Sequence, residues 1–272
     1  MIDLRAINKS QFSKAKYFWG AATLAKLCIF VFGLLSVLAD TPFANAPQWI
    51  IGIAVISEIL QTRSDALKSR AESLLRLLDM CRSFGRVISE SDKRDIIASI
   101  PRKLRKRFSS EKPADFYFNN EKPDGPQRAV ENLYESAWYT GHLSHAMLLF
   151  YLTMISAFVI VSIFALITAL QIDIAAPNQE RVIRAVTAWL MLIFSLNMVK
   201  GILGYINMYL RCEKTKAACL QLMSGAITES DAVRQWHEYH ISRSASPLIP
   251  DWLWEFRQSS LNDAWQSARE AI

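Results

Sequence analysis

Apolar residues are gathered into four long runs along this chain, and polar segments separate them. The third run, residues 146–172, contains no charged side chain. A helix rises about 1.5 Å per residue and needs about 20 apolar residues to cross the ~30 Å hydrocarbon core of a bilayer. This run is apolar on every face, whereas a helix in a soluble protein usually keeps a polar face. It therefore predicts a transmembrane helix rather than a buried core helix.

The first and second runs flank a turn at Asp40 to Pro42. The first, residues 17–39, is long enough to span, and the aromatic residues at its start suit a membrane–water interface. The second is densest in apolar residues between 49 and 60, which alone is too short to span. Counted from Phe43 to Gln61 it can cross with local thinning of the bilayer. A re-entrant or interfacial helix is the alternative.

The fourth run, residues 185–210, completes four predicted spans, and the distribution of Lys and Arg orients them. Residues 1–16, 61–145 and 211–272 carry 27 of the 31 basic side chains, and the short segments 40–47 and 171–184 carry few. Positive residues stay on the cytoplasmic side of a membrane. Both termini and the central segment are therefore predicted to be cytoplasmic.

The polar segments show helical periodicity. Leu67, Ala71, Leu74 and Leu78 recur at helical spacing, so the second span is expected to continue as a helix through residues 61–83. Similar extensions are expected at 127–145 and 211–223. Ser91 is expected to cap a short helix that ends before Pro101, and Thr228 or Ser230 a further helix through residue 240. A last amphipathic helix is expected after residue 252.

The predicted fold class is thus all-α: an integral membrane protein with four transmembrane helices whose helical extensions form a cytoplasmic domain. The expected organisation is a cytoplasmic N-terminus (1–16), transmembrane helices one and two (17–62), a cytoplasmic helical region (63–145), transmembrane helices three and four (146–210) and a cytoplasmic C-terminal helical region (211–272). A mean hydropathy of +0.13 with 21% charged residues fits such a mixture. The four cysteines have no metal-type spacing and are expected to be reduced thiols.

Polar residues inside the runs are the first candidate site. They are Lys26, Glu58, Asn197 and Lys200. An ionisable group at the bilayer centre costs at least ~2.5–3.5 kcal/mol, so it usually faces a bundle interior or a water-filled path. Glu58 lies at a depth that Lys26 reaches by snorkelling, and a Lys26–Glu58 pair would partly cancel both costs. The pattern indicates either a structural ion pair or the polar lining and gate of a pore.

Basic residues of the central segment are the second candidate site. The run Arg102, Lys103, Arg105, Lys106 and Arg107 precedes the aromatic residues 116–118, and Arg82, Arg86 and Arg128 lie nearby in sequence. Such residues bind phosphates or anionic headgroups, although a basic run is more often a solvated loop. The net charge of +6 mainly reports topology, so DNA or RNA binding is not expected.

Catalytic and metal-binding patterns are not found. There is no Walker sequence, GxGxxG, GxSxG or paired-carboxylate arrangement, and His237 and His240 are not completed into a metal site by nearby ligands. We therefore expect a protein that is not an enzyme and has no cofactor.

Three short stretches carry a family resemblance. They are LRA…FSKAK at 4–16, LYESAWYTGHLS at 133–144 and SPLIPDW at 246–252. With four spans in a two-plus-two arrangement, the chain resembles the SMODS-associated four-transmembrane effectors of bacterial anti-phage (CBASS-type) defence. It is short for that family between the second and third spans. The resemblance implies a homo-oligomeric, pore-forming effector of the bacterial inner membrane. A cyclic oligonucleotide made by a partner nucleotidyltransferase would trigger it and cause abortive infection.

Two other functions fit the residues. One is a small oligomeric channel or transporter subunit without a nucleotide trigger. The other is a membrane-anchored scaffold whose cytoplasmic helices bind a protein. In each case the lipid bilayer is the first partner, because the apolar runs require it.

Overall fold

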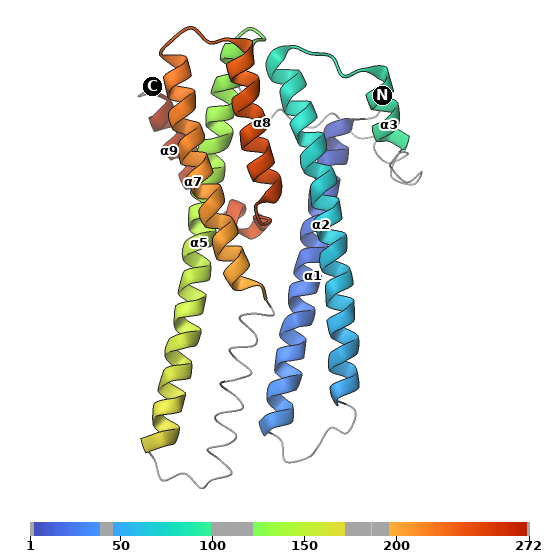
Figure 1. The fold of residues 1–272 in the computed structure, drawn as a ribbon, viewed down its shortest axis with the longest axis vertical. Coiled ribbons are helices and arrows are strands. Elements are labelled where there is room, and N and C mark those ends of the chain that lie inside the picture. The colour runs from blue at the N-terminus through green and yellow to red at the C-terminus, as the bar shows by residue number, and fades with distance from the viewer. Residues whose placement is uncertain (1–2, 39–45, 99–121, 172–185, 187–195, 271–272) are drawn as a thin grey trace. The chain divides into compact units, whose positions relative to one another are not determined.

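The computed structural model describes residues 3–38, 46–98, 122–171, 186 and 196–270. Within these ranges the chain is helical, with no strand. The helices are α1 (Leu4–Leu38), α2 (Ala46–Phe84), α3 (Glu90–Ala98), α5 (Pro126–Gln171), α7 (Met198–Met223), α8 (Glu229–Ala245) and α9 (Asp251–Glu270) (Figure 1). The predicted all-α class is confirmed for this part of the chain.

The helices divide between two compact units. The polar unit contains Met1–Lys14, Ala66–His145 and Ile206–Ile272, and the apolar unit contains Ala15–Asp65 and Ala146–Tyr205. Helices α1, α2, α5 and α7 each supply residues to both. The predicted continuation of the second and third runs as helices through 61–83 and 127–145 is confirmed by the bounds of α2 and α5.

Antiparallel pairing organises the helices. On α1 and α2, the Nδ2 of Asn8 donates to the carbonyl oxygen of Ala71 at 2.6 Å in the polar unit. In the apolar unit, the Oγ of Ser64 donates to the carbonyl oxygen of Ala15 at 2.7 Å. These bonds use the carbonyls of helix backbones as extra acceptors, so they fix the register of the two helices against each other.

The polar unit has a conventional packed core. Its buried apolar members come from α5, α7 and α8 and are Ala129, Val130, Leu133, Ala137, Met208, Cys212, Cys219, Ala232, Trp236 and Tyr239. The indole Nε1 of Trp236 donates to the carbonyl of Ala129 at 2.9 Å, so its polar edge is satisfied inside the core. Burial raises the pKa of the Cys212 and Cys219 thiols to about 12, and all four cysteines are free.

The apolar unit instead exposes large apolar side chains. Examples are Leu24 on α1, Ile51 on α2, and Ile160 and Phe164 on α5, each more than half exposed. Among the described residues, two helical stretches are long and apolar enough to cross a membrane by length and composition, Leu4–Phe32 and Pro126–Phe164, and few residues of either apolar stretch are buried. These helices give weak support for a membrane location.

Four spans are not confirmed. The second predicted span lies in α2, which does not reach the apolarity of a span because Glu58, Arg63 and Asp65 follow its short apolar part. Most of the fourth run lies outside the described residues.

Two local predictions were wrong in detail. The fourth run, 185–210, is predicted as one span that includes Asn197, but Asn197 lies in a turn with φ 53°, and α7 begins at the next residue. Asn tolerates this left-handed conformation better than most residues. The cap of the short helix α3 is Ser89 rather than Ser91, because the Oγ of Ser89 accepts from the N–H of Asp92 at 3.1 Å. The expected cap Thr228 is confirmed: its side chain accepts from the N–H of Asp231.

Candidate functional site

The polar residues of the apolar unit form the first candidate site. The Nζ of Lys26 on α1 lies 3.3 Å from the Oε1 of Glu58 on α2, so the predicted pair is present. The two partners differ in surroundings: the Lys26 side chain is 6% exposed and that of Glu58 is 69% exposed. The pair therefore neutralises a buried ammonium, while much of the carboxylate still faces outwards.

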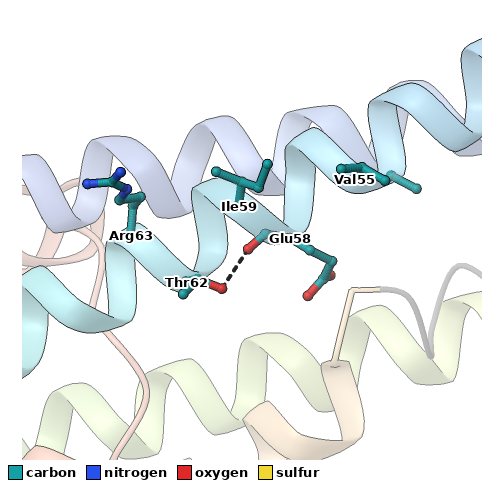
Figure 2. Close-up of a pocket in the computed structure, with 6 residues that line it drawn as sticks. Val55, Glu58, Ile59, Thr62 and Arg63 are labelled. Carbon is teal, nitrogen blue, oxygen red and sulfur yellow. Dashed lines mark hydrogen bonds between the residues drawn. The ribbon is translucent and has the colours of Figure 1, made fainter.

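An open groove adjoins Glu58. It has a volume of about 500 Å³ and is lined from α2 alone by Ala54, Val55, Glu58, Ile59, Thr62 and Arg63 (Figure 2). The hydroxyl of Thr62 donates to the carbonyl of Glu58 at 2.8 Å, so it is satisfied within the helix. The groove thus combines an apolar floor with one acidic and one basic side chain.

Lys200, another predicted polar residue of the apolar runs, does not line this groove. It is exposed on the first turn of α7.

The second candidate site is a group of charged residues in the polar unit, the arginine cluster: Arg5 of α1, Asp79 and Arg82 of α2, and Arg128 and Glu135 of α5. Burial and the positive charges of Arg5 and Arg128 lower the pKa of Arg82, and Asp79 and Glu135 oppose them. Arg5 and Arg128 are therefore each close enough to repel Arg82, and two carboxylates partly offset the repulsion.

The carboxylates of the cluster are strongly perturbed. Burial raises the pKa of Asp79 to about 7, although Arg243, Arg5 and Arg82 favour its charged form. Burial likewise raises the pKa of Glu135 to about 7 against the charges of Arg269 and Arg82. Near neutral pH both acids are therefore partly protonated, and the net positive charge of the cluster varies with pH.

Local backbone contacts bring Arg82 and Arg128 together. The N–H of Gly125 donates to the carbonyl of Ser83 at 3.0 Å, and the Nδ2 of Asn132 donates to the Oγ of Ser83 at 3.0 Å. Gly85 ends α2 with φ 69°, and a β-carbon there would lie 2.8 Å from the Cβ of Asp124. The last turn of α2 and the first turn of α5 are thus joined where each carries an arginine.

Arg128 itself is largely buried. Its Nη1 pairs with the carboxylate of Asp124 one turn earlier, and its side chain is 17% exposed. The buried Nε has no hydrogen-bond partner among the described residues. A guanidinium carries five donors, so Arg128 keeps donor capacity for an anion.

The other predicted basic residues do not join this cluster. Arg86 instead pairs with Glu229 of α8 and lies over the ring of Phe84, 5.5 Å from its centroid. The run Arg102, Lys103, Arg105, Lys106 and Arg107 lies outside the described residues.

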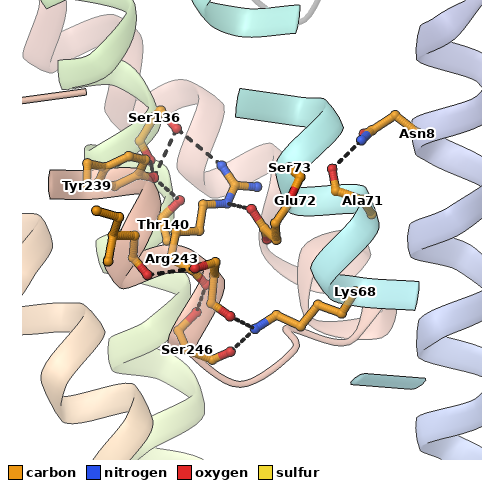
Figure 3. A network of polar contacts seen from close by, with 12 residues as sticks. Asn8, Lys68, Ala71, Glu72, Ser73, Ser136, Thr140, Tyr239, Arg243 and Ser246 are labelled. Carbon is orange, nitrogen blue, oxygen red and sulfur yellow. Dashed lines mark hydrogen bonds and ion pairs between the residues drawn. The ribbon is translucent and has the colours of Figure 1, made fainter. Parts of the chain in front are cut away.

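A polar network joins α2 and α5 to α8 (Figure 3). The Nε of Arg243 lies 3.4 Å from the Oε2 of Glu72, and its Nη1 donates to the Oγ of Ser136 at 3.5 Å. The hydroxyl of Tyr239 also reaches Ser136, and it donates to the Oγ1 of Thr140 at 2.9 Å. Because Arg243 also influences Asp79 electrostatically, the network and the arginine cluster are coupled.

The segment between α8 and α9 is held by Lys68. Its Nζ donates to the carbonyl of Ser244 at 2.8 Å and to that of Ser246 (Figure 3). A cation at the carboxyl end of a helix satisfies carbonyls that have no partner within the helix. Lys68 therefore fixes where α8 ends and the segment leading to α9 begins.

Sequence reasoning missed Arg5, Asp79, Glu135 and Arg243. One signal was available: Glu72, Asp79 and Arg82 follow at spacings of seven and three, which places them on one face of α2. Such a charged face is usually solvated, so the spacing alone did not distinguish a site. Among the described residues no group of His, Cys, Asp and Glu could hold a metal ion.

Comparison with known proteins gives no match to a family model, a curated protein or a solved structure.

Proposed function

We propose that this chain is a non-enzymatic membrane effector of phage defence, which depolarises the bacterial inner membrane when a cyclic oligonucleotide binds its polar unit. The observation that carries the proposal is the arginine cluster. Arg5, Arg82 and Arg128 come from three helices, and two of the carboxylates beside Arg82, those of Asp79 and Glu135, have pKa values near 7, while Asp124 pairs with Arg128. Phosphates are strong acceptors for guanidinium groups, so an anionic ligand can replace the carboxylates as their partner.

The apolar unit supplies the second part of the proposal. Its helices include the two apolar stretches, and it holds the Lys26–Glu58 pair and Lys200. Polar groups at membrane depth mark ion pathways more often than they mark inert lipid-facing surface. One chain offers few such groups, so a conducting path requires several copies.

The switch follows from helices shared by the two units. Arg82 and Glu58 lie on the same unbroken helix α2. A ligand shifts an equilibrium only if it binds one state more tightly than the other. A phosphate ligand that draws Arg5, Arg82 and Arg128 together favours one arrangement of the ends of α1, α2 and α5. In this proposal, the same helices carry that preference into the apolar unit.

Binding to the full chain in nanodiscs tests the trigger. Calorimetry against a panel of cyclic di- and trinucleotides should find one that binds, and Arg82→Glu should weaken it at least tenfold. Arg234→Glu is the matched control, because Arg234 is an exposed arginine of α8 that pairs with Asp231. Charge reversal at Arg105 and Arg107 tests whether the basic run contributes as well.

Membrane depolarisation in cells tests the output. With the signal-producing nucleotidyltransferase co-expressed, the wild-type chain should depolarise the membrane, and Arg82→Glu should need more signal. If no cyclic nucleotide binds and depolarisation is independent of the nucleotidyltransferase, a channel without a nucleotide trigger replaces this proposal. If depolarisation is absent altogether, a membrane-anchored scaffold replaces it.

A further inference from the structure

The groove on α2 exposes apolar side chains and a carboxylate side by side. Its apolar side chains Val55 and Ile59 are each 55% exposed, and between them stands Glu58, whose side chain is 69% exposed. Lys26 contacts the carboxylate from one side only. If this surface lies in hydrocarbon, lipid tails cannot hydrogen-bond the free side of the carboxylate, so lipid is a poor occupant of the groove.

A complementary surface lies on α7 of the same unit. Lys200 is exposed there, and Val199 and Leu203 beside it are 46% and 57% exposed. Within the described part of the chain, Lys200 forms no ion pair. This face is therefore a basic side chain flanked by two apolar ones, matching the acidic side chain flanked by two apolar ones on α2.

The two surfaces lie at similar distances from the end of the apolar unit. Glu58 is seven residues from Asp65, where α2 leaves this unit, and Lys200 is five residues from Tyr205, where α7 leaves it. At about 1.5 Å per residue these distances differ by about 3 Å. A side-by-side contact of two copies in one membrane thus brings the carboxylate and the ammonium to matching depth.

We infer that the occupant of the α2 groove is α7 of a second copy of this chain, with Lys200 of one copy paired to Glu58 of the next. The inference rests on the proposed function for the membrane placement of the apolar unit, and it names the interface of the oligomer. The contact joins two different surfaces, so a pair of copies still has one free groove, on one copy, and one free α7 face, on the other. A head-to-tail contact of this kind can be repeated from copy to copy, and it forms a ring where the rotation between neighbours closes. A ring provides the several copies that a conducting path requires.

Disulfide trapping between differently tagged copies tests this interface. In a chain whose native cysteines are replaced by alanine, Ile59→Cys is placed on one copy and Leu203→Cys on the other, both in nanodiscs. The two should form a mixed disulfide in high yield. Leu24→Cys on α1 is 62% exposed and serves as the control partner for Leu203→Cys, with a yield at least tenfold lower.

Charge substitutions test the ion pair. Lys200→Glu sets two carboxylates opposite each other and should lower the yield of mixed disulfide about tenfold, whereas Lys200→Arg should keep it. Lys214→Glu is the matched control, since Lys214 is an exposed lysine of α7 that belongs to the polar unit. A yield that does not respond to Lys200→Glu overturns the inference.

Two further outcomes also overturn it. One is a mixed disulfide no more abundant than with Leu24→Cys. The other is a chain carrying both Ile59→Cys and Leu203→Cys that forms only an internal disulfide, because the groove is then filled by α7 of the same chain. Trapping needs no ligand, so the interface can fail while nucleotide binding stands, and the reverse. A lipid-exposed spin label at Ile160→Cys separately reports whether the apolar unit is in the bilayer.

Discussion

Gly141 of α5 lies so close to Cys212 of α7 that a β-carbon at residue 141 would be 3.1 Å from the Cβ of Cys212. Few real β-carbons come this near to a neighbour, so Cys212 or one of the two helices must shift by a few tenths of an ångström to admit a methyl group. Cys212 is fully buried in the core of the polar unit, which leaves it no space to yield. Gly141 therefore sets the spacing of α5 and α7.

Gly141→Ala should lower the stability of the polar unit by about 1–3 kcal/mol, the usual cost of adding volume to a packed core. The higher helix propensity of Ala offsets up to about 1 kcal/mol of this. Thermal unfolding of the detergent-solubilised chain measures the change. Gly225→Ala is the control, because a β-carbon at residue 225 meets no atom within 4 Å. Equal unfolding temperatures for the two variants would mean that the α5–α7 contact tolerates a side chain.

His240 should make the polar unit sensitive to acid. Its ring is buried and stacked on Trp236, with centroids 4.9 Å apart, and neither ring nitrogen has a hydrogen-bond partner among the described residues. Burial is the main cause that lowers the pKa of His240 to about 3, and the positive charges of Arg243, Arg76 and His237 act in the same direction. The unfolded chain, with the usual pKa of about 6.5, binds more protons between these two values.

Stability should therefore fall as the pH drops from 6.5 towards 3, by up to about 1.4 kcal/mol per pH unit from this group. His240→Phe keeps a ring against Trp236 and removes the titration, so its unfolding free energy should depend less on pH in that window. His145→Phe is the control, since His145 is exposed on α5 and is not among the groups that shift the pKa of His240. A pH profile of His240→Phe that coincides with that of the wild-type chain would contradict the assignment.

Asp79 should act in the opposite direction. Its pKa is raised to about 7 in the folded chain from an ordinary value of 3.8, so the folded chain binds more protons between these values. Asp79 therefore contributes favourably to the free energy of unfolding below pH 4, and this contribution is lost as the pH rises towards 7.

Asp79→Asn should therefore raise the unfolding temperature above that of the wild-type chain by a few degrees more at pH 8 than at pH 5. The gain is limited because Arg5, Arg82 and Arg243 lose a counter-charge. Asp65→Asn on the exposed part of α2 controls for general effects of charge. If the unfolding temperatures of the wild-type chain and of Asp79→Asn respond equally to pH, the pKa of Asp79 is not raised in the folded protein.

Sequence patterns predicted helices more reliably than sites. Apolar spacing is a local property, so α2 and α5 could be traced through residues 61–83 and 127–145, and Thr228 could be recognised as a cap. The Lys26–Glu58 pair was also predictable, because membrane depth restricts which charges can meet. The arginine cluster was predictable only in part, because Arg82 and Arg128 were candidates from the sequence and Arg5, Asp79 and Glu135 were not. Arg5 and Asp79 are far apart in sequence, and only the register of α1 against α2 brings them together.

The number of spans is the prediction that most needs an experiment. Within the part of the chain that the structure describes, only Leu4–Phe32 and Pro126–Phe164 are apolar and long enough by composition, whereas the distribution of basic residues favours four spans. The two topologies differ at specific residues. With four spans, the central segment and the C-terminal helices lie in the cytoplasm, and residues 45 and 178 lie outside. If the second run does not cross, the central segment lies outside with residue 45.

Accessibility of single cysteines in intact cells to a membrane-impermeant maleimide separates these topologies. We expect Asn45→Cys and Asn178→Cys to react, and Arg105→Cys and Ala245→Cys to react only after the inner membrane is permeabilised. Reaction of Arg105→Cys in intact cells would show that α2 returns to the outer side, since Glu58 and the charges after it oppose crossing. Reaction of Asn178→Cys together with Ala245→Cys in intact cells would show that the fourth run does not cross. Either result would exclude the four-span effector. Arg105 or the C-terminal end of the fourth helix would then lie on the outer side of the membrane, where a ligand made in the cytoplasm cannot bind it.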